Sequence, residues 1–398
     1  MPEAYTHIRI ARMAQELLKD SIGPVENLSA YEMGANGPDP LFAHRAWSKR
    51  RPLEALAQKM HTEHCGRFLR AMIFRAYTPA QRDYTMGFLT HYAADTQLHP
   101  YVQAQAGPGG QFDRKEGHAF CESAMDTYFY EKDGQPTPMD GQQKAPSLSP
   151  NDLAEVTALL KACIGEVYHT EVTQEDLADS FHAFHWLHTR VLTVSQQKHA
   201  KRAGLTLVEC LVLRRPGFVR SHMTPAHLPP EGFRSEWNDP VTGFAHTQGP
   251  DELCTAAAQE AARMMKMTFA YWRGVAAPEQ LAVALGDKNY LTGQLSQNEE
   301  TENNKVLPQT APEPLAEAPA APSPAPQEIP VSAEAVPPQP GEAIPVIPAG
   351  SVPPQMGEMV PPVSPVQTQQ PLPAFQPGTE QQTQDFPLPQ NPPADGVL

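Results

Sequence analysis

Apolar side chains recur at helical spacing through most of the first 295 residues. Steps of three and four residues predict helices over 4–18, 52–76, 80–99, 114–130, 152–170, 174–200, 251–273 and 277–285. A short apolar run at 205–213 fits either a strand or a helix. Because no segment alternates convincingly between apolar and polar residues, the pattern predicts an all-α body.

Turn-forming residues separate the predicted helices. Glycine and proline indicate loops at 19–51, 106–110, 131–150 and 215–250. Thr78 and Pro79 form a helix start, with Thr78 as the N-cap and Pro79 at the first helical position. Pro100 predicts that the helix over 80–99 ends just before it.

The pattern changes abruptly after residue 295. Residues 296–398 hold 25 of the 44 prolines and account for 11 of the 15 net negative charges. A degenerate repeat begins at Val336 and again at Val352. This composition buries too little apolar area to offset chain entropy, so we predict a helical domain over 1–295 and a disordered, acidic Pro/Gln-rich tail over 296–398. The tail is either a solvated extension or a docking segment for a partner that recognises proline motifs.

The net charge and the cysteine spacing argue against several classes of protein. Without the tail the body is only slightly acidic, so nothing favours nucleic-acid binding through a basic surface. The five cysteines are widely spaced without a Cys-x-x-Cys pair, which argues against a disulfide framework or zinc ribbon. The N-terminal stretch resembles an amphipathic helix rather than a signal peptide, and no apolar run reaches the ~18 residues of a membrane span. We therefore expect a cytoplasmic protein.

One row of side chains is typical of a metal site. His91, Asp95 and His99 recur every fourth residue within an apolar segment. On a helix a step of four falls about 40° past a full turn, so the three side chains share one face. Imidazole and carboxylate groups are suitable zinc ligands, and the row predicts binding of one or more metal ions.

Further ligand-type residues precede and follow this row in a fixed order. The full pattern is Tyr5-Thr6-His7, Gly37-Pro38-Asp39, Met60-His61, His91-x3-Asp95-x3-His99-Pro100 and His118-x3-Glu122. This ordered set resembles the bacterial zinc-dependent phospholipase C family, whose wider relatives include the fungal single-strand nucleases. The resemblance covers residues 4–130 by motif and extends over 150–285 by helical architecture.

The resemblance implies an all-α fold with two or three Zn²⁺ ions in a cleft between helices. It assigns one ion to His61, His91 and Asp95, and a second to His99, His118 and Glu122. His7 would help hold a third ion with Asp95 bridging, and Asp39 would be a general base or an additional ligand. The implied reaction is hydrolysis of a phosphodiester, with a phospholipid-like substrate, by zinc-activated water.

The chain departs from the family pattern in places. Family members are secreted, and their mature N-terminal residue helps hold the third metal. Here Pro2 would supply that amine once Met1 is removed. The interval from His99 to His118 is longer than in the family's lipases, and His44 and His64 compete with His61 for its role.

Three alternative functions follow from the same residues. The metal cluster also suits a nuclease, or a non-catalytic, metal-stabilised helical module that anchors the tail. A di-iron bundle would need Glu-x-x-His pairs, which the set lacks.

Other residues fit smaller roles. His182, His185 and His188 fit packing or surface positions better than a shared ligand set, and Asp126 fits a solvent-facing or supporting position. Phe112, Tyr84 and Tyr101 are candidates for an apolar lining near the cleft.

Overall fold

The computed structural model describes residues 4–295, except 47, 49, 137–138, 194–206, 208–220, 225 and 227. The predicted tail over 296–398, the amine of Pro2 and most of the run at 205–213 lie outside the described residues. The division after residue 295 therefore stays a prediction.

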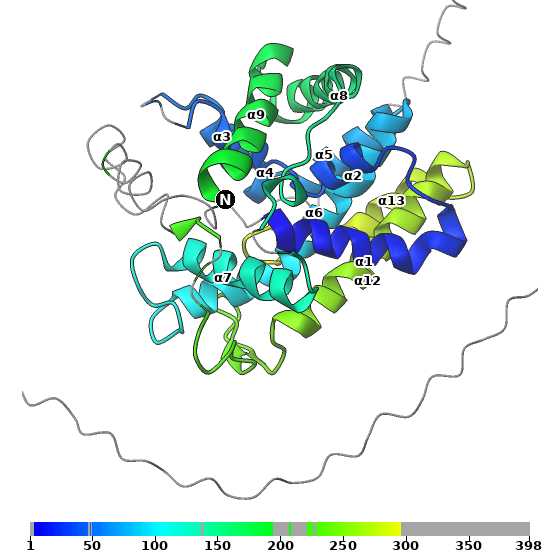
Figure 1. Ribbon diagram of the computed structural model, residues 1–398. Helices are drawn as coiled ribbons and strands as arrows, with labels where there is room; N and C mark the ends of the chain where they lie inside the picture. The colour runs from blue at the N-terminus through cyan, green and yellow to red at the C-terminus, as the bar shows by residue number, and fades with distance from the viewer. Residues whose placement is uncertain are drawn as a thin grey trace, which may run out of the picture. The chain divides into compact units, whose positions relative to one another are not determined.

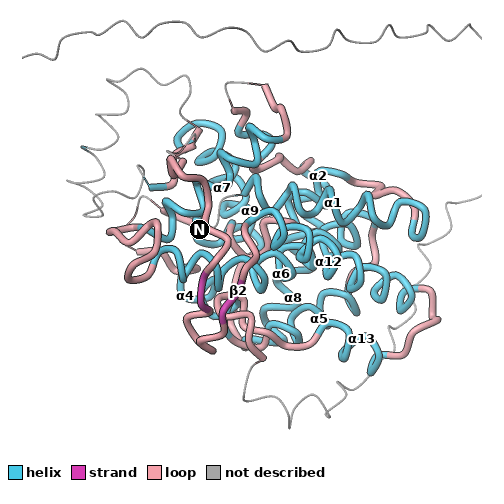
Figure 2. Tube along the Cα trace, turned by 90° about the horizontal axis from the view of Figure 1, so that it is seen from below, coloured by secondary structure: helices cyan, strands magenta, loops and turns pink. Residues whose placement is uncertain are grey.

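The described part is mainly α-helical, which confirms the predicted fold class (Figure 1). Its α-helices are α1 (Ala4–Ile22), α2 (Leu28–Gly34), α3 (Pro40–Ala43), α4 (Glu54–Thr62), α5 (Cys65–Arg75), α6 (Pro79–Ala106), α7 (Gly117–Lys132), α8 (Pro150–Tyr168), α9 (Gln174–Trp186), α12 (Pro250–Trp272) and α13 (Pro278–Leu285). A 3-10 turn, η1 (Gly141–Gln143), and a π-helical turn, η2 (Leu187–Leu192), supplement them. A short antiparallel hairpin pairs β1 (Trp237–Asn238) with β2 (Ala245–His246), and Figure 2 shows it among loops.

Helix α6 is the central element. It packs most extensively against α2 and α12, and most of its side chains are buried. Its start agrees with the prediction, because Thr78 and Gln81 form a capping box ahead of Pro79. The contact with α2 depends on glycine: a Cβ on Gly87 would lie 1.9 Å from the carbonyl oxygen of Tyr31. Two hydrophobic clusters cover α6, one towards α2 and α8 and one towards α7 and the start of α12.

The predicted helix end before Pro100 is wrong. Helix α6 continues through Pro100 to Ala106. An interior proline costs about 3 kcal/mol, but Tyr101 and Val102 are fully buried in the second cluster, and burying each side chain contributes about 1.5–3 kcal/mol. Burial of apolar side chains beyond the proline thus outweighs the missing hydrogen bond.

Three other predicted elements need correction. The helix over 52–76 is two helices, because His64 has a left-handed backbone (φ 54°) between α4 and α5. The loop over 19–51 contains α2 and α3. Helix α2 was missed because it has only seven residues, although Asn27 caps it through the N–H of Ala30. Of the helix predicted over 174–200, the α-helical part α9 ends at Trp186 and η2 follows it to Leu192, while residues 194–200 lie outside the described residues.

None of the helices in the described ranges is long and apolar enough to cross a membrane.

Candidate metal centre

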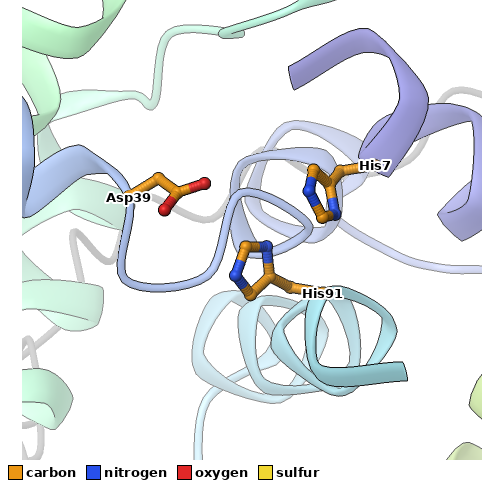
Figure 3. Close-up of side chains that lie close together, drawn as sticks. All are labelled: His7, Asp39 and His91. Carbon is orange, nitrogen blue, oxygen red and sulfur yellow. The ribbon is translucent and has the colours of Figure 1, made fainter. Parts of the chain in front are cut away.

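The structure gathers all eight predicted site residues into one continuous cluster. They come from α1 (His7), the turn before α3 (Asp39), the end of α4 (His61), α6 (His91, Asp95, His99) and α7 (His118, Glu122). Figure 3 shows three of them, His7, Asp39 and His91, facing one another from three separate parts of the chain. Seven of the eight are buried, and His118 keeps 40% of its side chain exposed.

Asp95 lies at the middle of the cluster and faces four histidines. Its Oδ1 is 3.3 Å from Nε2 of His7. Its Oδ2 is 3.2 Å from Nε2 of His91, 3.5 Å from Nδ1 of His99 and 3.7 Å from Nε2 of His61. One carboxylate therefore contacts ligand-type side chains from three helices.

Three sets of side chains bring ligand atoms within 4.8 Å of one another. The His61 group is His61, His91 and Asp95; the His118 group is His99, His118 and Glu122; the His7 group is His7, Asp39 and His91. The first two have the same members as the two zinc sets that the resemblance implied. The third joins Asp39 to His7, and His91 belongs to two groups.

The donor atoms are those that a metal would satisfy. Several buried polar atoms make no well-directed hydrogen bond among the described residues, even where an imidazole and a carboxylate lie 3.2 Å apart. They include His7 Nδ1, Asp39 Oδ1, His91 Nε2, Asp95 Oδ2 and Glu122 Oε2. A buried polar atom without a partner costs about 1–3 kcal/mol, so five of them in one place need a common explanation. Imidazole and carboxylate donors suit Zn²⁺, and the residues therefore fit this metal.

Main-chain carbonyls orient three of the histidines. Nδ1 of His61 lies 2.7 Å from the carbonyl oxygen of Ala57, and Nδ1 of His91 lies 3.2 Å from the carbonyl oxygen of Ala35. In His99, Nδ1 lies 3.3 Å from the oxygen of Tyr290. A carbonyl that accepts the Nδ1 proton leaves the Nε2 lone pair directed into the cluster, as metal-binding histidines require.

Electrostatics within the cluster favours ionised carboxylates. Burial opposes ionisation of Asp95, but His91 and His99 outweigh it and hold the Asp95 pKa well below its usual range. Burial likewise opposes ionisation of Glu122, and His118 reverses the balance, so its pKa also lies well below the usual value. Burial lowers the pKa of His7 to about 4, which keeps this imidazole neutral and its lone pair available at neutral pH.

The competing histidines lie elsewhere. His44 is buried beside α9, with Nε2 3.5 Å from Oδ1 of Asp176. His64 directly precedes α5, and its ring packs towards the ring of Tyr168. Of the three candidates only His61 belongs to a donor group, so the structure favours His61 for this role over His44 and His64.

Asp39 does not act as a turn-forming or capping side chain. It precedes α3, but its carboxylate makes no capping hydrogen bond there. Oδ1 instead lies 3.2 Å from Nε2 of His61. The preceding Gly37 has a left-handed backbone (φ 52°), and a Cβ at this position would lie 2.1 Å from Cδ2 of His91. Glycine therefore allows the Asp39 turn to lie directly on the His91 ring.

A small pocket opens between the His7 and His118 groups. Its volume is about 20 Å³, room for about one water molecule. Its lining consists of Thr6, His7, Asp95, Leu98, His99, Val102, Glu122 and Met125. The predicted apolar lining by Phe112, Tyr84 and Tyr101 is wrong, because all three are buried in the core clusters.

Sequence reasoning missed one contributor to the centre. Tyr290 is buried against the cluster: its N–H donates to the oxygen of His61 (2.8 Å), and its ring lies 5.3 Å from that of His61 and 5.7 Å from that of His91. No motif near residue 290 pointed to this role, because it depends on main-chain groups.

The remaining histidines of the second half do not form a shared ligand set. His182 is exposed, and Nδ1 of His185 lies 2.6 Å from the carbonyl oxygen of Ala145. His188 is buried against Phe184. Their different environments agree with the predicted packing and surface roles.

Comparison with known proteins bears on this cluster. Residues 6–189 match the family model described as zinc-dependent phospholipase C, which confirms the resemblance drawn from the motifs. The matched segment includes all eight site residues and excludes Tyr290. No curated protein and no solved structure gives a significant match.

Proposed function

We propose that this chain, whose residues 6–189 are a zinc-dependent phospholipase C-like domain, is a zinc-dependent phosphodiesterase that acts on a phospholipid-like substrate. The observation that carries the proposal is a set of three neighbouring donor groups, each made of imidazoles and a carboxylate. Two of them share His91, and Asp95 faces histidines from all three. Several neighbouring donor groups are the arrangement that clustered metal ions require, whereas a single structural zinc needs only one closed set of four ligands.

The chain's own residues prepare this centre in two ways. The carbonyls of Ala57, Ala35 and Tyr290 fix the rings of three histidines before any ligand arrives. The carboxylates of Asp95 and Glu122 are held ionised by the neighbouring histidines. Zn²⁺ held by these groups supplies Lewis acidity, which makes water a better nucleophile and neutralises charge on a phosphoryl group.

Asp39 is the proposed general base. Its carboxylate is buried beside His61 and His91, and it is not used for capping. A carboxylate in this position can orient the attacking water and accept its proton. Its membership of the His7 group makes ligation the competing role.

Access to the centre favours approach past His118, whose side chain is 40% exposed while the other seven are at most 7% exposed. The pocket beside His7 and His99 has apolar walls formed by Leu98, Val102 and Met125. Because this pocket has room for about one water molecule, it suits the attacking water beside the ligands, and the substrate would lie outside it.

The reaction proposed is a hydrolysis. Water adds to phosphorus, the bond between phosphorus and the glycerol oxygen breaks, and the glycerol oxygen gains a proton. The products are a diacylglycerol and a phosphorylated head group.

Metal content and substrate range test this proposal together. Full-length protein purified without added metal is analysed for its elements and then assayed against a phospholipid, single-stranded DNA and a phosphomonoester. We expect two or three zinc ions per chain and cleavage of the phospholipid. Cleavage of DNA alone would identify a nuclease. A fully zinc-loaded protein that cleaves none of the three would favour the non-catalytic binding module.

A further inference from the structure

A buried carboxylate outside the three donor groups holds the start of α1. Oδ1 of Asp126 accepts hydrogen bonds from the N–H (2.8 Å) and the hydroxyl (2.7 Å) of Thr6, and Oδ2 accepts one from the N–H of Tyr5 (3.0 Å). The first N–H groups of a helix have no partner within it, and a carboxylate there is also favoured by the helix dipole. Because His7 follows Thr6 directly, Asp126 fixes the segment from which the His7 ring projects.

The same carboxylate belongs to the helix that carries the His118 group. Asp126 follows Glu122 by four residues on α7, so the two carboxylates lie on one face of that helix. Glu122 contacts His99 and His118, while Asp126 contacts the first turn of α1. Helix α7 thus provides ligands for one donor group and sets the position of another.

A fully buried lysine connects this anchor to the turn that carries Asp39. Nζ of Lys144 lies 3.1 Å from Oδ2 of Asp126, and neither side chain is exposed. The carbonyl of Lys144 accepts a hydrogen bond from the side-chain amide of Asn36 (3.2 Å). Asn36 is next to Ala35, whose carbonyl faces Nδ1 of His91. Lys144 therefore contacts Asp126, which holds the start of α1 beside His7, and Asn36, which lies in the turn that carries Asp39.

We propose that Asp126 and Lys144 are positioning residues for the His7 group. Asp126 holds His7 from one side, and Lys144 joins that anchor to the Asn36–Asp39 turn from the other. Neither residue belongs to a donor group. Its role is to keep three ligands from α1, the turn and α6 within bonding distance of one ion. This inference rests on the proposed function only in that the His7 group holds zinc.

Zinc titration of the full chain tests the role. In Asp126→Asn the side chain keeps its size but loses its charge. We expect one zinc ion to bind roughly 10- to 100-fold more weakly, the range typical of groups that support metal ligands. The ions at the other groups should keep their wild-type affinity. Unchanged affinity for every ion would overturn the proposal.

The matched control is Asp133→Asn. Asp133 also joins α7 to α1, through Arg9 (2.8 Å) and the hydroxyl of Tyr5 (3.0 Å), but its side chain is 25% exposed and these partners lie outside the donor groups. We expect wild-type zinc affinity in this variant. A loss equal to that of Asp126→Asn would show that any link between the helices suffices, and the specific role would be rejected.

A double-mutant cycle with His7→Ala asks whether Asp126 acts through His7. Removing His7 already weakens the same ion, so Asp126→Asn should add little in that background. Full additivity would overturn the proposal.

Removing both charges separates positioning from stability. A buried charge without its partner is strongly destabilising, so Asp126→Asn/Lys144→Met should regain thermal stability relative to Asp126→Asn. Under the proposal its zinc affinity stays low, and recovery of zinc affinity with stability would refute it. These measurements use zinc alone, so a wild-type protein without phosphodiesterase activity would refute the proposed function and leave this test intact.

Discussion

Gly37 lies directly against the ring of His91, and no other residue type fits there. A Cβ would lie 2.1 Å from Cδ2 of the ring, and the backbone is left-handed at φ 52°. In Gly37→Ala we expect displacement of His91, loss of zinc, and a lower free energy of unfolding.

The control for this variant is Gly23→Ala. Gly23 is also left-handed (φ 80°), but a Cβ added there would meet nothing within 4 Å. The substitution should cost only the backbone term, roughly 1–2 kcal/mol, with unchanged zinc content. Equal zinc content in the two variants would show that the contact with His91 is unimportant.

Removal of Asp95 should cost more zinc than removal of any single histidine. Asp95 belongs to one donor group but faces histidines from all three, namely His7, His61, His91 and His99, whereas each histidine belongs to one or two groups. Elemental analysis of purified Asp95→Ala beside His7→Ala, His61→Ala and His118→Ala measures the difference. Retention of the full metal complement by Asp95→Ala would contradict its central role.

Substitution of Asp39 separates a base from a ligand. If Asp39 accepts the proton of the attacking water, Asp39→Asn should keep its zinc and lose about 10²- to 10⁴-fold in turnover. If Asp39 is a ligand in the His7 group, one zinc ion should be lost as well. Wild-type zinc content together with wild-type turnover would eliminate both roles.

Chelation should destabilise the whole helical body. The donors come from α1, α4, α6 and α7, and removing zinc leaves their buried polar atoms without a partner. A ligand present at a thousandfold excess over its Kd adds about 4 kcal/mol, so the melting temperature should fall on the order of 10 °C. Differential scanning fluorimetry before and after chelation measures the shift. Zn²⁺ should restore it and Mg²⁺ should not, because Mg²⁺ prefers oxygen ligands.

A pH effect on stability is expected away from the metal centre. Burial raises the pKa of Asp83 to about 6, although its carboxylate accepts the N–H of Asn27 at 2.6 Å. The folded state therefore holds this proton more tightly than the unfolded chain, whose Asp pKa is about 3.9. The stabilising contribution is complete below that value and is lost as pH rises towards 6.

Denaturant unfolding at pH 4, 5, 6 and 7 tests this effect. Wild type should lose stability relative to Asp83→Asn between pH 4 and 6, and the difference should then level off. A constant difference across this range would show that Asp83 does not titrate abnormally.

Local sequence was sufficient to predict which residues form the cluster, and insufficient to predict the contacts that support them. The four-residue steps in His91–His99 and His118–Glu122 require only helical geometry, so both rows could be placed before the fold was known. Asp126 has the same spacing from Glu122, but sequence alone gave no sign that it binds the first turn of α1. That contact links residues 120 positions apart, and nothing local encodes it.

The predicted helix boundaries at His64 and Pro100 were wrong for a similar reason. Pro100 is a local stop signal, but burial of Tyr101 and Val102 against distant parts of the chain overrides it. The break at His64 lies inside a segment whose apolar spacing predicts one continuous helix. In both cases tertiary packing decides the outcome, and it is invisible to a pattern read over a few residues.

The contact of Tyr290 with His61 and His99 has a consequence for biosynthesis. A nascent chain that has released residues up to α7 carries every proposed ligand, but it lacks the main-chain groups of Tyr290 that accept from His99 and donate to His61. Translation is nearly complete for the body before these arrive. We therefore expect metal capture to be a late step of maturation, and ribosome-bound chains stalled before Tyr290 should retain zinc less well than released chains.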